Sequence, residues 1–304
     1  MSGMSLVSVI IPTHSGSENI CRAVDSILAQ TYENVEAIVV DDNGRGTEEQ
    51  LKTQKEIEKY KDEPRVKYIM HEVNKNGSAA RNTGIRASQG DYIAFLDDDD
   101  AFHPDNIEKH LALLTKLPED YGLTYCGFIN IIPGMKDEII HPSQEGDVLF
   151  DFLVRKMRVG TSLILMKREV IDYVKEWDES FRRHQDWEFL ARVLQRYKMG
   201  RVDNVGISKY ITGRHNAKQP DVFMKNRIHF LEKMKPIIEQ FEKKKQKKIY
   251  DVHYSHIGLE YFKAKKILKS IQWALKTSNP FGVFLGYFVS GLNYLKKRVK
   301  SVIK

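Results

Sequence analysis

Residues 90–100 read Gly-Asp-Tyr-Ile-Ala-Phe-Leu-Asp-Asp-Asp-Asp. The apolar run at residues 92–96 predicts a short buried strand, and four carboxylates follow it without a break. Adjacent carboxylates repel one another, and a divalent cation relieves that repulsion because Mg²⁺ and Mn²⁺ prefer oxygen ligands. The stretch therefore predicts either a metal site or a solvated acidic turn ahead of a helix that is expected to begin at Pro104.

The residues before this stretch predict the sheet to which its strand belongs. Three similar apolar runs lie at residues 7–11, 35–40 and 66–70, and segments with helical spacing separate them. This alternation predicts an α/β fold, in which helices flank both faces of a mostly parallel, Rossmann-like sheet. The helices are expected at residues 17–28, with Ser17 as N-cap, and at residues 48–61 and 78–88.

Polar residues stand at the ends of three of these strands. They are Pro12-Thr13-His14 after the first strand, Asp41-Asp42 after the second and Asp97 to Asp100 after the fourth. Ligands of parallel sheets bind beyond the carboxyl ends of the strands. We therefore expect the three groups to converge on one site.

The second half of the chain has looser patterns. Strands are expected at residues 121–132 and 161–166, a helix at residues 188–196, and helical, basic structure from residue 221 onward. Residues 225–304 hold 19 Lys and Arg against 5 Asp and Glu, so their charge is +14, and the rest of the chain carries +7 − 14 = −7. The basic part suits an anionic membrane better than nucleic acid, for which only the lysine-rich run argues.

The two cysteines, Cys21 and Cys126, fit neither a metal-ligand spacing nor a disulfide framework, so a reducing compartment is expected. The N-terminal residues lack a signal-peptide pattern. Together these features predict a cytoplasmic protein.

Five ordered stretches resemble family 2 glycosyltransferases, which have the GT-A fold. They are residues 7–14 (VSVIIPTH), 26–32 (SILAQTY), 39–42 (VVDD), 76–84 (NGSAARNTG) and 90–100. The resemblance covers residues 6 to about 115 and continues more weakly to about 220. It implies a GT-A domain over residues 1–220, with a nucleotide-sugar-binding half (1–115) and an acceptor half (116–220). Residues 221–304 then form a helical, basic C-terminal region.

On the donor side, the resemblance implies a nucleotide site with a metal. Pro12, Thr13 and His14 would line the base, although His14 also suits a plain strand end. Asp42 would accept the imide N–H of uracil, which favours a UDP-sugar without excluding dTDP. The alternative for Asp41 and Asp42 is an Asx-type turn at Asp-Asn-Gly.

The acidic run resembles the DXD motif of the family. Asp99 would be the main ligand of Mn²⁺ or Mg²⁺, Asp97 and Asp98 would orient the nucleotide, and Asp100 would be structural or cap the next helix. Asn76 also belongs to the implied nucleotide site. Arg81 would face the diphosphate or brace the acidic loop through a carboxylate contact.

On the acceptor side, residues 182–192 (RRHQDWEFLAR) resemble the segment that carries the catalytic base of the family. Asp186 would be that general base, or alternatively the N-cap of the following helix. His184 and Trp187 would lie beside the acceptor, with Trp187 as a platform or core residue. His215 would be a metal or diphosphate ligand, or an ordinary loop histidine.

The implied reaction moves a sugar from a nucleotide-sugar, a UDP-hexose or UDP-N-acetylhexosamine, to a hydroxyl of a glycan or lipid-linked acceptor, with inversion and a divalent metal. Two alternatives remain. One is a non-catalytic nucleotide-sugar-binding protein of the same fold, and the other is a glycoside hydrolase that uses a carboxylate pair. The chain lacks the Gly-rich, Lys-bearing loop of P-loop NTPases after its first strand.

The last part of the chain combines an uncharged segment with a basic one. Residues 281–295 carry no charge, and residues 296–300 read Lys-Lys-Arg-Val-Lys. As a helix, the uncharged segment spans roughly 22 Å, less than the hydrocarbon core of roughly 30 Å. We therefore expect peripheral attachment to the inner face of the cell membrane. The alternative is packing on the body of the protein or on a second copy in a homo-oligomer.

Overall fold

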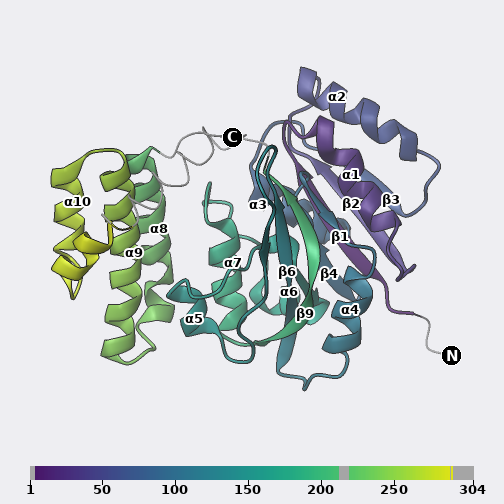
Figure 1. Ribbon diagram of the computed structural model, residues 1–304. Coiled ribbons are helices and arrows are strands. Elements are labelled where there is room, and N and C mark those ends of the chain that lie inside the picture. Colours follow the sequence, from purple (N-terminus) through teal and green to yellow (C-terminus); the bar gives the residue numbers. More distant parts are fainter. Residues whose placement is uncertain (1–3, 212–218, 288, 290–304) are drawn as a thin grey trace. The chain divides into compact units, whose positions relative to one another are not determined.

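The computed structural model describes residues 4–211, 219–287 and 289 (Figure 1). The chain divides into two compact units. The first comprises Met1–Leu149 and Met157–Thr212, and the second comprises Phe150–Lys156 and Gly213–Lys304. The second unit thus takes a short piece from the middle of the chain, which no sequence pattern predicts.

Four parallel strands form one half of the sheet in the first unit. They are β1 (Val7–Thr13), β2 (Val35–Asp41), β3 (Val66–Met70) and β4 (Tyr92–Phe95). β1 lies between β2 and β4, and β3 lies outside β2. Both faces of β1 are buried, which explains why its sequence is a continuous apolar run instead of an alternating one. The expected parallel arrangement of these strands is confirmed.

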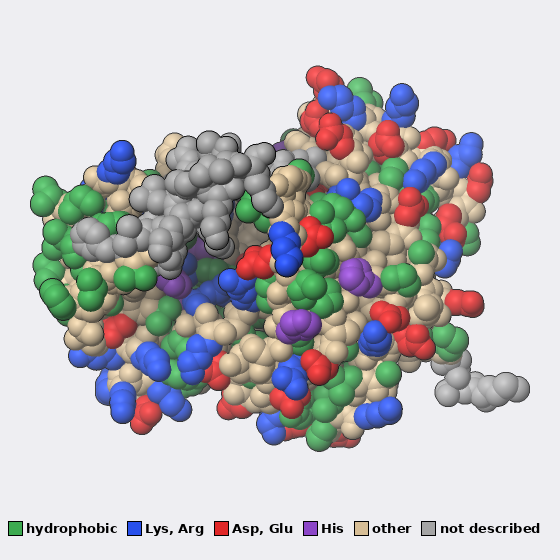
Figure 2. All heavy atoms as spheres, in the orientation of Figure 1, with side chains coloured by type: hydrophobic (Ala, Val, Ile, Leu, Met, Phe, Trp, Pro, Cys, Tyr) green, Lys and Arg blue, Asp and Glu red, His purple; other side chains and the backbone are tan. Residues whose placement is uncertain are grey.

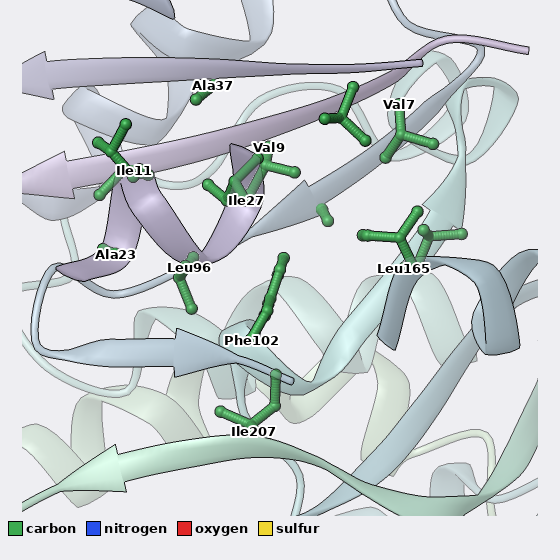
Figure 3. Packing of buried hydrophobic residues seen from close by; sticks show 14 of the residues in the cluster. Val7, Val9, Ile11, Ala23, Ile27, Ala37, Leu96, Phe102, Leu165 and Ile207 are labelled. Carbon is green, nitrogen blue, oxygen red and sulfur yellow. The ribbon is translucent and has the colours of Figure 1, made fainter. Parts of the chain in front are cut away.

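Helices cover both faces of these strands. They are α1 (Ser17–Leu28), α2 (Glu48–Ile57) with the 3₁₀ turn Glu58–Tyr60, and α3 (Gly77–Ala87). Ile27 of α1 packs with Val9 and Ile11 in the main core (Figure 3). On the other face, Ala80 of α3 packs against Ile38 and Val40 of β2.

The other half of the sheet is of mixed direction. Its strands and helices are β5 (Asp100–Phe102), α4 (Asn106–Leu114), β6 (Tyr121–Ile131), β7 (Glu138–Ile140), the 3₁₀ turn Thr161–Leu163, β8 (Ile164–Lys167), α6 (Arg168–Val174), α7 (Gln185–Leu194) and β9 (Lys198–Tyr210). Within the described residues the sheet has nine strands, in the order β3-β2-β1-β4-β8-β6-β9-β5, with β7 beside β6. β8 is antiparallel to both of its neighbours, and β5 is antiparallel to β9.

Several predicted boundaries are wrong. The N-cap of α1 is Gly16, so Ser17 lies inside the helix. The helix expected at Pro104 begins at Asn106, because the chain between the acidic run and that helix forms β5 instead. Residues 161–163 form a 3₁₀ turn ahead of β8.

β5 and β9 are the elements that complete the surroundings of the acidic run. Asp100, the last residue of the run, begins β5 and lies opposite Lys209 of β9 in the antiparallel ladder. The register of this ladder therefore places Lys209, which follows Asp100 by 109 residues in the sequence, next to the Asp100 carboxylate.

The second unit is helical, as expected. It contains α5 (Leu149–Leu153), which begins one residue before this unit, together with α8 (Pro220–Ile238), α9 (Lys243–Lys263) and α10 (Ile267–Ala274). The buried His253 of α9 donates from Nε2 to the carbonyl oxygen of Leu153, at 2.9 Å. In the part of the chain that the structure describes, no helix is both long enough and apolar enough to cross a membrane.

Candidate active site

The first carboxylate of the acidic run is held by cations inside the first unit. Arg81 donates from Nη2 to Asp97 Oδ1 at 2.8 Å. Burial raises the pKa of Asp97, but the charges of Arg81 and Lys209 outweigh it and hold that pKa below its ordinary value. Asp97 is therefore ionised at neutral pH, and its charge is already partly compensated by the protein.

Asp98 meets the end of β1. Thr13 donates from Oγ1 to Asp98 Oδ2 at 2.6 Å. A Cβ atom on Gly16 would lie 1.7 Å from the same oxygen, so a larger residue there would displace the Asp98 carboxylate. The expected convergence of the first and fourth strand ends is thus present in the structure.

The last two carboxylates have different surroundings. Asp99 is half-buried, and its backbone carbonyl accepts from Arg22 Nη2 at 3.0 Å. Asp100 is 3% exposed, and its Oδ2 accepts from Lys209 Nζ at 2.7 Å. Burial raises the pKa of Asp100 to about 6, although Lys209 opposes the shift. The N-cap of α4 is Asp105, so the suggestion that Asp100 caps that helix is wrong.

Asp42 organises the loop that follows β3. Its Oδ1 accepts from His71 Nδ1 at 2.7 Å and from the Lys75 backbone at 2.8 Å. Its Oδ2 accepts from the Asn76 backbone at 2.8 Å and from Asn74 Nδ2 at 3.1 Å. A carboxylate offers about four acceptor sites, so all of them are in use. A nucleotide base can reach this carboxylate only if one of these donors leaves.

The neighbouring Asp41 forms the Asx-type turn. Its Oδ1 accepts from the backbone N–H of Asn43 at 2.9 Å, and its Oδ2 accepts from Tyr68 at 2.6 Å. Asp41 therefore closes the Asx-type turn, whereas Asp42 anchors the loop that follows β3. His14 is exposed at the end of β1, with Nδ1 3.1 Å from Asn74 Nδ2, and Pro12 is half-buried within the strand.

Asn76 and Arg81 connect α3 to the chain around the start of α7. Asn76 caps α3 by accepting from Ser78 and Ala79, and its Nδ2 donates to the Glu179 carbonyl at 2.9 Å. Arg81 is buried and donates from Nη1 to Gln185 Oε1 at 3.1 Å. Of the two roles considered for Arg81, the bracing contact with the acidic loop is seen directly, through one nitrogen.

Asp186 lies in the first turn of α7. The N-cap of this helix is His184, whose φ is +62°, and Asp186 is the second helical residue, so its role as N-cap is wrong. The helix is anchored by Phe189, whose ring stacks on Trp177 with centroids 4.1 Å apart. The rings of His184 and Trp187 stack with centroids 4.0 Å apart, on the half-buried side of the helix.

One cavity of about 250 Å³ joins the candidate base to the acidic run. Asp97 and Asp186 both line it. The other lining residues are Arg81, Gly160, Thr161, Arg183, His184, Gln185 and Lys209. A Cβ atom at Gly160 would lie 3.8 Å from Asp186 Oδ2, so a glycine leaves space beside that carboxylate. The arrangement can hold a ligand between a carboxylate on α7 and a charged loop on the sheet edge.

The carboxylates suit a cation that a substrate completes. Among the described residues, no group of three His, Cys, Asp or Glu side chains could hold a metal by itself. Mg²⁺ usually takes one or two protein carboxylates and fills its shell with phosphate oxygens and water. The half-buried, oxygen-only pair Asp98 and Asp99 fits that mode. His215 lies outside the described residues.

Sequence reasoning missed several residues of this site. Lys209 reaches it through the pairing of β5 with β9, and Ser162 reaches it from the 3₁₀ turn ahead of β8; sequence patterns reveal neither. Gln185 stands directly before the candidate base, and Arg183 stands three residues before it. His71 had a usable signal, because it follows the end of β3 as Asp42 follows β2. The same strand-end reasoning that selected Asp42 selects His71.

Comparisons with known proteins identify the family of this chain. The profile of the family described as Glycosyl transferase family 2 matches residues 8–172. The amylovoran biosynthesis glycosyltransferase AmsB of Erwinia amylovora is 28% identical over 236 residues, which are 75% of this chain and 77% of AmsB. A longer, uncharacterized glycosyltransferase of Rickettsia felis is 30% identical over 62% of this chain, which spans 31% of that protein.

Two solved structures share the fold. TarS 1-349 of S. aureus, in complex with UDP-GlcNAc, has a TM-score of 0.66 at 16% identity, covering 89% of this chain and 79% of its own. The mannosyltransferase PcManGT from Pyrobaculum calidifontis, in complex with GDP-Man and Mn²⁺, has a TM-score of 0.62 at 14% identity. The match covers 99% of this chain and 84% of the PcManGT chain. These likenesses establish the GT-A fold. Since the family profile also spans more than half of the sequence, the chain belongs to glycosyl transferase family 2.

Proposed function

We propose that this glycosyltransferase moves a hexose or N-acetylhexosamine from a UDP-sugar to a hydroxyl of a glycan or lipid-linked acceptor, with inversion at the anomeric carbon. The observation that carries the proposal is the shared cavity of about 250 Å³, lined by Asp97 of the acidic run and Asp186 of α7. A donor bound on the acidic run presents its sugar toward Asp186. TarS with UDP-GlcNAc and PcManGT with GDP-Man show that this fold accepts more than one base, so the base must be selected locally.

On the donor side, the nucleotide base lies against the end of β1, at Pro12, Thr13 and His14. Asp42 accepts the imide N–H of uracil in exchange for the Asn74 amide, the longest of its four contacts at 3.1 Å. This exchange couples binding of the base to the loop after β3. Asn76, Arg81, Asp97 and Asp98 flank the ribose and the diphosphate.

Asp99 is the protein ligand that we assign to Mn²⁺ or Mg²⁺. When bound, the metal neutralises charge that builds on the departing nucleoside diphosphate. Thr13 fixes Asp98 beside Asp99, and Arg81 and Lys209 compensate the carboxylates on either side. His215 as an additional ligand stays a prediction.

Asp186 acts as general base on the acceptor. It takes the proton of the acceptor hydroxyl while that oxygen bonds to the anomeric carbon and the bond from this carbon to the phosphate oxygen breaks. Attack comes from the face opposite the nucleotide, so the configuration inverts. Asp186 lies in the first turn of α7, where the helix dipole stabilises a negative charge. His184 and Trp187 border the acceptor.

We also propose that the protein works in the cytoplasm at the inner face of the cell membrane, where a lipid-linked acceptor would be available. The uncharged segment at residues 281–295 supports this proposal. Of its described residues, Phe281 is 81% exposed and Leu285 is 55% exposed. Residues 290–304 lie outside the described part of the chain.

A donor panel tests the proposed reaction. Metal-free protein is mixed with UDP-, dTDP- and GDP-sugars, with and without Mn²⁺ or Mg²⁺, and thermal stabilisation and release of nucleoside diphosphate are measured. We expect stabilisation and release with UDP-sugars and metal together. Cleavage of a glycoside without nucleotide would instead indicate a hydrolase. Stabilisation by donors without turnover, with acceptors supplied, would indicate a non-catalytic binding protein.

A further inference from the structure

We propose that α10 docks the second unit on an anionic lipid surface, through a folded face that is distinct from the basic C-terminal tail. Leu268 and Leu275 are seven residues apart, which places them on the same side of the helix, and they are 80% and 66% exposed. Ile271, between them, is also exposed, whereas Ser270 and Ala274 on the other side are buried. The helix therefore has a well-packed inner side and an apolar outer side.

The following helical segment repeats this pattern. Phe281 and Leu285 are four residues apart on one helix face, and both are exposed. On the inner side, Tyr287 is buried and packs against Gly258 of α9. Figure 2 shows the hydrophobic side chains gathered over α10. Contiguous exposed apolar surface of this kind marks a place of contact with a partner or a membrane.

The charges around this face identify the occupant. From Tyr261 to Tyr287 there are no Asp or Glu residues, but there are five lysines, namely Lys263, Lys265, Lys266, Lys269 and Lys276. An amphipathic helix with apolar side chains and flanking lysines is the pattern of an interfacial membrane helix.

At the start of α10, residues 265–269 line a depression of about 410 Å³ that contains three lysines, which can contact anionic headgroups. A second copy of the chain fits less well, because a two-fold contact through this face would bring the lysines of both copies together.

Vesicle co-sedimentation of the full chain tests the proposal. The vesicles are phosphatidylcholine alone or phosphatidylcholine mixed with phosphatidylglycerol, and neither donor nor acceptor is present. We expect binding to the anionic vesicles that high salt weakens. Leu268→Glu/Leu275→Glu should weaken it about tenfold or more, because the apolar anchors are replaced while the tail stays intact. Leu51→Glu is the matched control, since Leu51 is a leucine of α2 that is 57% exposed in the first unit.

A second variant tests the charges. Lys265→Gln/Lys276→Gln should also weaken binding to anionic vesicles, and it avoids the two lysines that bind Asp221. Unchanged binding of Leu268→Glu/Leu275→Glu would overturn the proposal, as would equal loss in the Leu51→Glu control. Self-association that the double glutamate variant abolishes, without vesicle binding by the wild type, would also overturn it. Because binding is read without substrates, either result leaves the proposed reaction to its own test.

Discussion

Replacing Lys209 with methionine tests whether this residue of β9 compensates the charge of Asp100, the last carboxylate of the acidic run. Lys209 Nζ lies 2.7 Å from Asp100 Oδ2, and Asp100 is 3% exposed. Burial raises the pKa of Asp100 to about 6 even with this cation beside it. Without Lys209, the carboxylate must either remain charged in a buried site or keep its proton to a higher pH.

The size of the effect follows from that choice. Removing one partner of a buried ion pair costs about 3–5 kcal/mol when the other stays charged. A group with a raised pKa stabilises the native state at low pH, and this contribution is lost as the pH rises through the folded-state pKa. In the wild type, the stabilisation by protonated Asp100 falls as the pH rises and is gone once the pH passes about 6. In the variant, Asp100 keeps its proton to a higher pH, so this stabilisation keeps falling above about pH 6, by up to about 1.4 kcal/mol per pH unit. We therefore expect a loss of about 1 kcal/mol at about pH 5 that grows to about 3–4 kcal/mol at about pH 8.

Urea unfolding at the two pH values measures this loss. Lys198→Met is the matched control on the same strand, because Lys198 Nζ lies 2.6 Å from Asp120 Oδ2 but its side chain is 45% exposed. Such a surface pair contributes about 0–1 kcal/mol. Asp100→Asn/Lys209→Met should recover most of the stability, since no buried charge is left unpaired. The reasoning is refuted if Lys209→Met loses no more than Lys198→Met, or loses the same amount at both pH values.

Three further predictions concern the donor side. Gly16→Ala should displace the Asp98 carboxylate, which lies 1.7 Å from the new Cβ, and weaken metal-dependent donor binding in calorimetry; Gly286→Ala, with open space around it, should not. Asp42→Asn should orphan donors of the loop after β3 and cost about 1–3 kcal/mol in thermal unfolding, so an unchanged melting temperature would contradict the role given to Asp42. Asp99→Ala should lose activity and metal dependence together, and a variant that Mn²⁺ still activates fully would show that Asp99 is not the ligand.

The part of the site nearest the parallel strands could be predicted from the sequence. Continuous β-branched runs indicated strands buried on both faces, and parallel strands end at a common edge, so Thr13 and Asp98 were expected to meet. The distinction between Asp41 and Asp42 could not be made in this way. Both follow β2, and only the loop at residues 71–76 shows that one of them closes a turn while the other anchors that loop.

The rest depends on long-range pairing that local patterns do not encode. Asp100 could be read as a helix cap, because nothing near it indicates a three-residue strand whose partner is β9. The same limit applies to Lys209. The N-terminus of α7 was expected three residues too late because His184 adopts a left-handed conformation, which sequence rules reserve mainly for Gly and Asn. The GT-A fold and the glycosyltransferase family were thus predictable, whereas the cation network behind the acidic run was not.

The most direct test of the proposed mechanism is single-turnover transfer by Asp186→Asn with a donor found in the panel. Asp105→Asn is the matched control, because Asp105 is also a carboxylate at a helix N-terminus but is paired with Lys109 on α4, apart from the residues that line the cavity. We predict that Asp186→Asn lowers the transfer rate about 10²–10⁴-fold while donor affinity stays within about twofold, and that Asp105→Asn behaves as the wild type. Near-normal transfer by Asp186→Asn would contradict its assignment as the general base.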